Sequence, residues 1–270
     1  MKTVSIIRNI NEAKQLKTID AFILPIKDFS INYENYFDIT ELKEIIKTNK
    51  EIFVSLNKNI PNSELKNLKQ TLLEIEKLNI KGIIFYDIAI VNLKNELNLK
   101  TPLVWHQEHL TTNYATVNYW YEKGCKYAYL SSELTLKELK EIKQNTKSQI
   151  FVNVFGHLPM FTSKRHLVNN YTETFKIPKT NANKTLYKET KHYPISDTKV
   201  GTTVYSNYIL NILDQDLNFI DYIVFNPYLI EEDDFEKVIY DYKHQNKISK
   251  YPYNHGFLYK KTIYKVKKNE

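Results

Sequence analysis

Short apolar runs alternate along the chain with longer stretches in which apolar residues recur at helical spacing. The runs are rich in β-branched and aromatic residues, which is typical of buried strands. They cover residues 3–7, 20–24, 52–56, 82–86, 103–105, 127–130, 150–155 and 222–225. The stretches between them predict helices at residues 13–16, 39–47, 61–75, 90–97, 112–123, 134–142, 208–213 and 233–242.

Eight strands that alternate with helices predict a parallel α/β fold, and this number of strands in 270 residues suits a (β/α)8 barrel of the TIM type. A doubly wound open sheet is the alternative. No GxGxxG motif follows the first strand and no GxxxxGK(S/T) motif occurs, so the usual signature of a nucleotide-binding open sheet is absent. We therefore expect residues 1–270 to form a single barrel domain.

The alternation breaks down after the seventh strand. Residues 172–206 read as extended segments around turns, which predicts an antiparallel β insertion. Residues 256–270 alternate apolar residues with lysines, as an exposed or edge strand does, and form a basic C-terminal tail.

Residues 151–171 (FVNVFGHLPMFTSKRHLVNNY) hold the densest group of candidate functional side chains. The apolar strand stops at Gly156, and a polar cluster that includes His157, Lys164 and Arg165 follows at once. Barrel enzymes keep their sites at the carboxyl ends of strands, so this position favours a functional site. The alternative is a solvated loop with aromatic residues packed beneath it.

Arginine is scarce in this lysine-rich chain, which has only Arg8 and Arg165. Lysine replaces arginine well as a point charge, but not where a planar fork must grip a carboxylate or phosphate with two hydrogen bonds. Both arginines follow predicted strands. We therefore expect each of them to bind an anion.

In a barrel, the residues that follow each strand share one face. Carboxylates and imidazoles suit acid–base chemistry, and cations and amides suit binding of a polar anion. The candidates for acid–base catalysis are Glu133, His157 and Asp87. The candidates for binding substrate or anion are Arg165, Arg8, Lys164, Asn57, His106 and Asn113.

Several of these side chains have structural alternatives. Asp87 and Glu133 are equally suited to cap the helices that follow them, and His157 to bond a backbone carbonyl. His106, Glu108 and His109 suggest a metal site, but near-adjacent loop residues are poor ligand spacing, so we expect no metal.

Two common nucleophiles are also disfavoured. Ser163 lacks the GxSxG motif of serine hydrolases. Cys125 precedes the sixth strand, at the wrong end of a barrel for catalysis, and reads as a core residue.

The composition sets outer limits on function. A formal charge of +7 and a pI of about 9.0 permit binding to nucleic acid or to an acidic partner, although the lysine bias alone accounts for them. A single cysteine excludes an intrachain disulfide and any all-cysteine iron–sulfur or zinc site. No membrane-length apolar run and no signal-peptide pattern is present, so we expect a cytoplasmic protein.

A series of motifs, in order along most of the chain, resembles those of the collagenase-like peptidase family U32. The strand FVSLN, which ends at Asn57, is similar to the family's VTLN, and TTN at residues 111–113 is similar to its VTN. GCKYAYLSSELTLKEL resembles GVKRVVLARELSLEEI, with Glu133 on the glutamate of that motif. FGHLPMFTSKRHLV resembles the signature HGALCMAYSGRCLLS.

The sequence departs from the family at two places. The signature's two cysteines fall on Pro159 and His166, and the further cysteines that hold an iron–sulfur cluster in some members are missing, so we expect no cluster. VFNPY, from Val224, stands where the family has KIEGR. The resemblance therefore does not predict, for this chain, any activity that depends on the KIEGR motif.

The resemblance implies a barrel fold and a function. Family members carry a peptidase label without established catalytic residues, and some are linked to hydroxylation of the tRNA wobble uridine to 5-hydroxyuridine, with prephenate implicated. The chain is accordingly expected to act in that hydroxylation beside a longer, cysteine-bearing paralogue, with tRNA as a possible partner. A dicarboxylate such as prephenate would then suit Arg8 and Arg165. A peptidase of unknown catalytic type and a non-catalytic scaffold subunit remain the alternatives.

Overall fold

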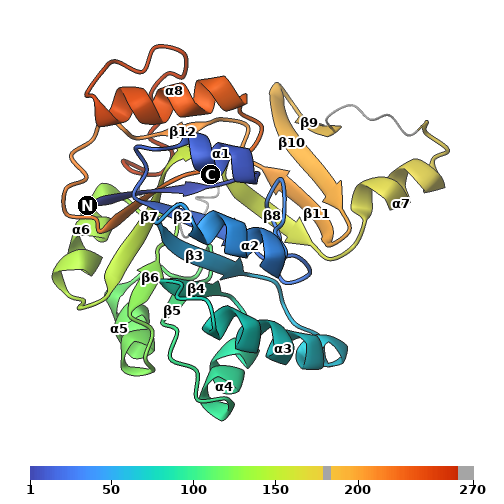
Figure 1. Cartoon of the computed structure of the whole chain (residues 1–270). Helices are drawn as coiled ribbons and strands as arrows, with labels where there is room; N and C mark the ends of the chain where they lie inside the picture. Colours follow the sequence, from blue (N-terminus) through green and yellow to red (C-terminus); the bar gives the residue numbers. More distant parts are fainter. Residues whose placement is uncertain (179–183, 261–270) are drawn as a thin grey trace, which may run out of the picture.

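Eight parallel strands close into a barrel in the computed structural model, which describes residues 1–178 and 184–260 (Figure 1). The strand order is β7-β13-β1-β2-β3-β4-β5-β6, and β6 pairs back with β7 to close the ring. The predicted (β/α)8 barrel is confirmed, and the open sheet is excluded. The strands are β1 (Lys2–Ile6), β2 (Ala21–Pro25), β3 (Glu51–Leu56), β4 (Gly82–Phe85), β5 (Leu103–His106), β6 (Tyr127–Tyr129), β7 (Gln149–Gly156) and β13 (Tyr222–Phe225).

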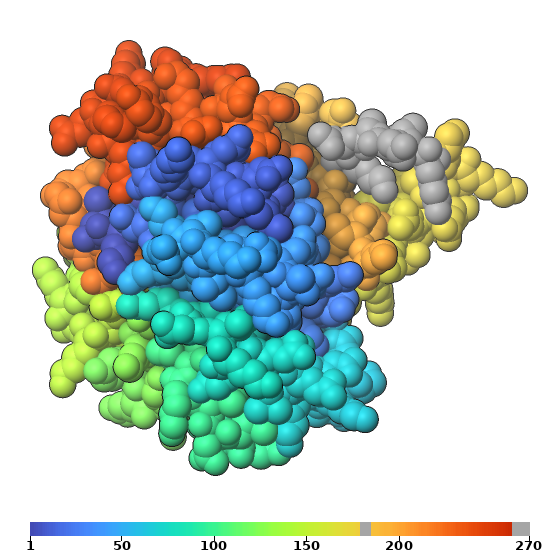
Figure 2. All heavy atoms as spheres, viewed as in Figure 1, coloured from blue at the N-terminus to red at the C-terminus, as the bar shows by residue number. Residues whose placement is uncertain are grey.

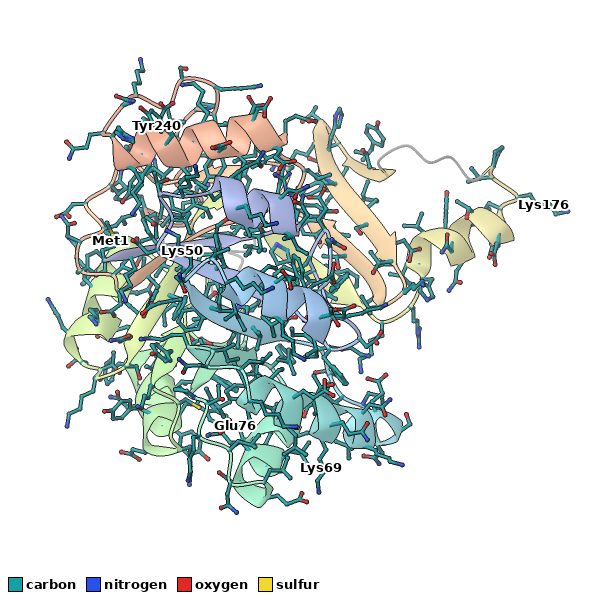
Figure 3. All side chains as sticks on the ribbon, viewed as in Figure 1. Met1, Lys50, Lys69, Glu76, Lys176 and Tyr240 are labelled. Carbon is teal, nitrogen blue, oxygen red and sulfur yellow. The ribbon has the colours of Figure 1, made fainter. Side chains whose placement is uncertain are left out.

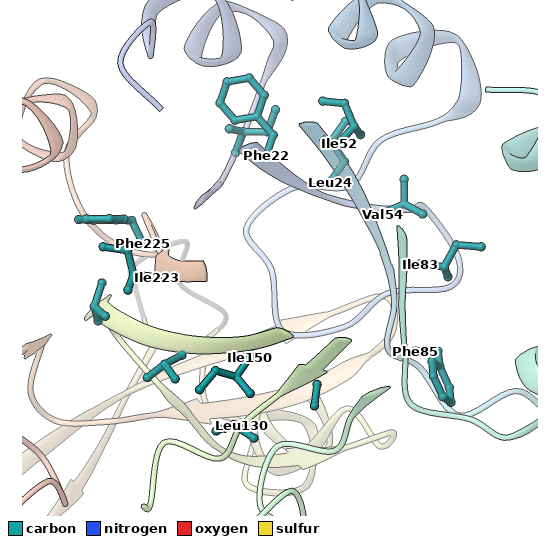
Figure 4. Packing of buried hydrophobic residues seen from close by; sticks show 14 of the residues in the cluster. Phe22, Leu24, Ile52, Val54, Ile83, Phe85, Leu130, Ile150, Ile223 and Phe225 are labelled. Carbon is teal, nitrogen blue, oxygen red and sulfur yellow. The ribbon is translucent and has the colours of Figure 1, made fainter. Parts of the chain in front are cut away.

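Helices surround the barrel and cover the outward side chains of its strands (Figure 4). Their amphipathic spacing explains this, since Leu68, Leu72 and Ile75 recur on one face of α3 and are all buried. The helices are α1 (Ile10–Gln15), α2 (Ile39–Ile46), the short 3₁₀ helix η1 (Asn62–Glu64), α3 (Leu65–Glu76), α4 (Ala89–Glu96), α5 (Tyr114–Glu122), α6 (Leu136–Gln144) and α8 (Glu232–Lys243).

Aromatic rings fill the centre of the barrel. Phe151 stacks on Tyr222 with centroids 4.3 Å apart, and Phe53 meets these two rings edge-on at 5.0 and 5.4 Å. Gly82 leaves room for this packing, because a Cβ there would lie 3.1 Å from the ring of Phe53. The filled centre leaves space for a ligand only at an end of the barrel.

The described part of residues 159–205, named the arm here, is a four-stranded antiparallel sheet with one helix that projects from the barrel (Figures 1 and 2). The sheet order is β8-β11-β10-β9, and the helix lies between β8 and β9 in sequence. The elements are β8 (Pro159–Ser163), α7 (Leu167–Thr174), β9 (Lys184–Lys188), β10 (Lys191–Thr198) and β11 (Gly201–Tyr205).

The predicted antiparallel insertion is confirmed, but the sheet begins before residue 172. Pro159–Ser163, within the stretch expected to form a polar cluster after the seventh strand, form β8 because they pair with β11, and Lys164 and Arg165 follow that strand. The two ends of the arm lie together: the Ser206 backbone N–H donates to the Leu158 carbonyl at 2.8 Å, and the Leu158 N–H donates to the Ser206 hydroxyl at 3.0 Å.

The C-terminal part of the chain differs from the predicted elements at residues 208–213. The helix predicted at residues 208–213 is wrong, because Leu210–Asn211 forms the short strand β12, antiparallel to β7. A six-residue apolar run does not distinguish a strand from a helix. The strand predicted at 256–270 lies mostly outside the described residues, and residues 256–259 form a turn. No helix in the described part of the chain has the length and apolar character to span a membrane.

Replacing Phe53 by alanine should lower the free energy of unfolding by about 3–5 kcal/mol, because it removes the ring that the other central aromatics contact. Urea denaturation measures this change. Leu73→Ala is the control, since Leu73 is 40% exposed on α3 and its truncation should cost less than about 0.5 kcal/mol. Equal losses for the two variants would show that the central rings do not stabilise the barrel.

Candidate functional site at the barrel mouth

A cavity of about 290 Å³ lies at the carboxyl ends of the barrel strands, between the barrel and the arm. Its volume is at the lower end of the range for small-molecule sites. Asparagine and tyrosine predominate among the polar side chains of its wall. The polar and aromatic lining residues are Asn32, Tyr33, Asn57, His106, Glu108, His109, Tyr129, Ser132, Glu133, Asn153, Lys191, Tyr193, Ser206, Asn207, Tyr208 and Asn226.

Glu133 and His109 contact each other on the wall of this cavity. His109 follows β5 and Glu133 follows β6, and the Nδ1 of the histidine lies 3.1 Å from the Oε1 of the glutamate. Each side chain is about half exposed. A carboxylate that orients an imidazole in this way leaves the other ring nitrogen to accept or return a proton. The geometry of this pair is therefore compatible with proton transfer at a ligand in the cavity.

Asn32 connects the barrel to the arm beside the cavity. Its Nδ2 donates to the Glu108 carboxylate at 3.1 Å, and its Oδ1 accepts from Thr162 on β8 at 3.0 Å and from Thr203 on β11 at 2.6 Å. Asn32 has a φ of 68°, a left-handed conformation that asparagine tolerates better than most residues. Burial raises the pKa of Glu108.

The floor of the cavity is a network of neutral side chains. The Tyr129 hydroxyl donates to the Asn153 Oδ1 at 2.5 Å, and the Asn153 Nδ2 donates to the Ser132 hydroxyl at 2.9 Å. His106 stacks on Tyr129 with ring centroids 4.3 Å apart, and its Nδ1 is buried without a partner among the described residues. Burial lowers the pKa of His106 to about 3, so its ring is neutral near pH 7.

Asn57 and Lys164 lie at a second depression that shares Asn32, Glu108 and His109 with the cavity. Asn57 also lines the cavity itself, but its amide is bonded to both the N–H and the carbonyl of Ile31. Lys164 donates to the Asn59 carbonyl at 3.2 Å. The structure thus brings Glu133, His106 and Asn57 together at the cavity, with Lys164 beside it.

The other predicted site residues do not line the cavity. The guanidinium of Arg8 donates to the buried carboxylate of Glu12 at 2.8 and 3.2 Å and to the Ile230 carbonyl at 2.6 Å. This fork is engaged within the protein and is not open to a ligand. The exposed side chain of Arg165 has no hydrogen-bond or ion-pair partner in residues 1–178 and 184–260, and no bond links it to Arg8, Glu133 or His157.

Three of these candidates make structural contacts with the backbone. The carboxylate of Asp87 accepts from the N–H groups of Ile60 and Ala89, at 2.8 and 2.9 Å. The Nδ1 of His157 lies 3.0 Å from the Ser206 carbonyl, and burial lowers the pKa of this histidine. Asn113 caps α5 by accepting from the Thr116 N–H at 2.8 Å.

No other chemistry is evident within residues 1–178 and 184–260. Three or more potential metal ligands do not come together there. Cys125 is buried, and burial raises the pKa of its thiol to about 12, so it is not a thiolate nucleophile near neutral pH.

Sequence reasoning missed Asn32, Tyr129, Asn153 and Asn207 as cavity residues. Tyr129 and Asn153 could have been found from the sequence, because they are polar residues at inward positions of otherwise apolar strands. Asn32 and Asn207 lie in loops, and their positions depend on how the arm folds back over the barrel.

Comparison with known proteins identifies the family of the chain. The model of Peptidase family U32 matches residues 10–225. "tRNA hydroxylation protein P2" of Bacillus subtilis is 30% identical over 193 residues, which cover 68% of this chain and 62% of that protein. "tRNA hydroxylation protein P" of Escherichia coli is 26% identical over 151 residues, 56% of this chain and 33% of that protein.

An archaeal protein is also similar. An uncharacterized protease of Methanocaldococcus jannaschii is 30% identical over 158 residues, which cover 54% of this chain and 38% of that protein. The chain therefore spans less than two thirds of the length of each of these three relatives.

Replacing Asn32 by glycine should loosen the arm, because glycine adopts the same φ but has no amide to bond Thr162 and Thr203. We expect faster hydrogen–deuterium exchange in β8 and β11, equivalent to a loss of about 1–3 kcal/mol in local opening free energy, and unchanged exchange in β3 and β4. Asn49→Gly is the control, since exposed Asn49 has a φ of 58° and no side-chain bond among the described residues. The same exchange pattern in both variants would contradict the bridging role.

His106 should make stability depend on pH. Its folded pKa of about 3 lies below the ordinary 6.5, so the unfolded chain binds a proton that the folded chain does not over this interval. The unfolding free energy should therefore fall as the pH drops from about 6.5 towards 3. His106→Phe keeps a ring against Tyr129 and should reduce this decline, as measured by urea denaturation at pH 7 and pH 4.5. Identical pH dependence in the two proteins would rule out a buried neutral imidazole.

Proposed function

The chain belongs to peptidase family U32, and from that premise we propose that it acts in hydroxylation of the wobble uridine of tRNA. Two of its relatives are named as tRNA hydroxylation proteins, which supports this choice over the peptidase label. The wobble base belongs to a single-stranded loop, where an enzyme can unstack a base at low cost. We place this work in the cytoplasm, where tRNA is found.

The observation that carries the proposal is the character of the cavity. Tyrosine rings and asparagine side chains line it, and its volume of about 290 Å³ suits one unstacked pyrimidine. The exposed Asn207 has no side-chain partner among the described residues, so its amide is free to pair with the O4 and N3–H edge of uracil. The proposed base would stack on tyrosine rings, as unpaired bases commonly do in RNA-binding proteins.

In the proposed hydroxylation this chain binds the base and moves a proton, and another molecule supplies the oxygen atom. Replacement of the C5–H bond of uracil by C5–OH is a two-electron oxidation that requires an oxygen donor. The His109–Glu133 pair is placed to move a proton at the bound base. In our proposal the oxygen donor comes with a longer paralogue, and a dicarboxylate such as prephenate takes part as a ligand. Lys191 is the lysine of the cavity wall that a carboxylate would meet.

A second candidate function is a non-catalytic subunit that stabilises the paralogue. The observation that favours it concerns Asn226, which follows β13 within VFNPY, where the family has KIEGR. Its Nδ2 donates to the His157 carbonyl at 3.0 Å, and its Oδ1 accepts from the Tyr228 N–H at 3.1 Å. These bonds give this position a structural role in the present chain.

Deletion of the gene should remove 5-hydroxyuridine and its derivatives from the wobble position, as measured by mass spectrometry of tRNA nucleosides. The wild-type gene should restore them. Glu133→Gln removes the charge that orients His109, and a typical general-base contribution predicts at least a 100-fold slower reaction. We therefore expect this variant to leave the modification near the deletion level.

The control is Glu141→Gln, which changes an exposed carboxylate on α6 that has no side-chain partner among the described residues. It should restore the modification fully. Unchanged nucleosides in the deletion strain would refute the proposed function. If the Glu133→Gln variant, present at normal levels, restores the modification fully, the chain acts as a non-catalytic subunit.

A further inference from the structure

The arm carries an exposed apolar groove that the barrel chemistry does not use. The groove lies between α7 and the antiparallel sheet, encloses about 1090 Å³ and is open to solvent. Three aromatic side chains are the most exposed of its large apolar residues: Tyr187 is 69% exposed, Tyr171 56% and Phe161 52%. Exposed apolar surface on this scale marks an interaction site.

Positive charge is concentrated in the same part of the chain. Residues 159–205 contain eight lysines and arginines against three aspartates and glutamates, a formal charge of +5 out of +7 for all 270 residues. Asp197 is paired with His166. The exposed Lys188 and Lys191 have no acidic partner in residues 1–178 and 184–260. The arm is therefore complementary to a polyanion, whereas the rest of the chain is nearly neutral.

The groove is continuous with the cavity at the barrel mouth. Met160 on β8 and Tyr193 on β10 line both of them, and Phe161 lines both the groove and the depression beside Lys164. A chain that passed from the groove to the cavity would stay in contact with the protein. Lys176 lies near the far end of the arm, and Tyr240 lies on α8, on the barrel (Figure 3).

We propose that the arm is a binding surface for single-stranded RNA and holds the nucleotides that flank the base in the cavity. This inference rests on the proposed function. Its basis is the combination of exposed aromatic rings with unpaired lysines, since bases stack on rings while cations contact phosphates. A protein partner would also cover the rings, but the +5 charge favours RNA.

The test is fluorescence anisotropy with two labelled probes, an anticodon stem-loop with uridine at the wobble position and an oligouridylate. Tyr187→Ala should weaken binding roughly tenfold, the effect of losing one base–aromatic stack. Lys188→Glu should also weaken binding and reduce its dependence on salt. Both side chains are exposed on the arm, so the variants should fold, and circular dichroism checks this.

Matched controls lie on the barrel, away from its mouth. Tyr240→Ala changes a 51% exposed ring towards the end of α8, and Lys77→Glu changes an exposed lysine just after α3. Both should bind RNA like the wild type. RNA binding by the arm variants with wild-type affinity would overturn the inference. Arm variants that lose self-association or binding to the paralogue, but still bind RNA, would also overturn it.

The binding assay is independent of hydroxylation, so the two proposals fail separately. In one case, the arm variants bind RNA normally while deletion of the gene abolishes wobble hydroxylation. This result would refute RNA binding by the arm and leave the proposed function intact. In the opposite case, the arm variants bind oligouridylate more weakly while tRNA nucleosides are unchanged in the deletion strain. This result would support RNA binding by the arm and refute the proposed role in hydroxylation.

Discussion

The side-chain amide of Asn32 fixes the position of the arm over the barrel. One end of this amide donates to Glu108 on the barrel, and the other accepts from the two adjacent arm strands β8 and β11. These bonds are partly or fully buried, and a buried amide that loses its partners carries a desolvation cost. The shape of the cavity therefore depends on the arm being seated, because its walls come from both bodies.

The cavity combines few charges with many neutral polar groups. His106 stays neutral because burial lowers its pKa, and Tyr129 stays protonated because burial raises its pKa well above the usual range. Glu108, whose pKa burial also raises, receives a hydrogen bond from Asn32. Such a lining favours contacts by hydrogen bonds and stacking over contacts by charge, and its lysine, Lys191, comes from the arm.

The barrel could be predicted from the sequence because its signals are local. Each barrel strand is a short apolar run, so the number and order of the barrel strands follow directly. The carboxyl-end rule also predicted that Glu133, His106 and Asn57 share one end of the barrel, where all three line the cavity. The helix expected at 208–213 failed because six residues carry too little periodicity to define a helix.

The scarcity of arginine predicts a specific contact for each guanidinium but not the purpose of that contact. A guanidinium fork is retained wherever a two-pronged contact matters, but that contact is structural as readily as functional. Arg8 uses its fork on Glu12 and Ile230, within the protein. The sequence also could not show that a loop residue such as Asn32 would reach the arm, because this contact joins segments about 130 and 171 residues apart.

The hydrogen bonds between Leu158 and Ser206 close the arm at its base, so the chain leaves the barrel and returns to it at nearly the same point. An appendage attached in this way places no demand on strand order or closure of the barrel. Its length and surface can change during evolution while the barrel keeps its own folding constraints. Relatives that share this barrel can therefore diverge in what they bind by exchanging or remodelling one segment, without redesigning the scaffold.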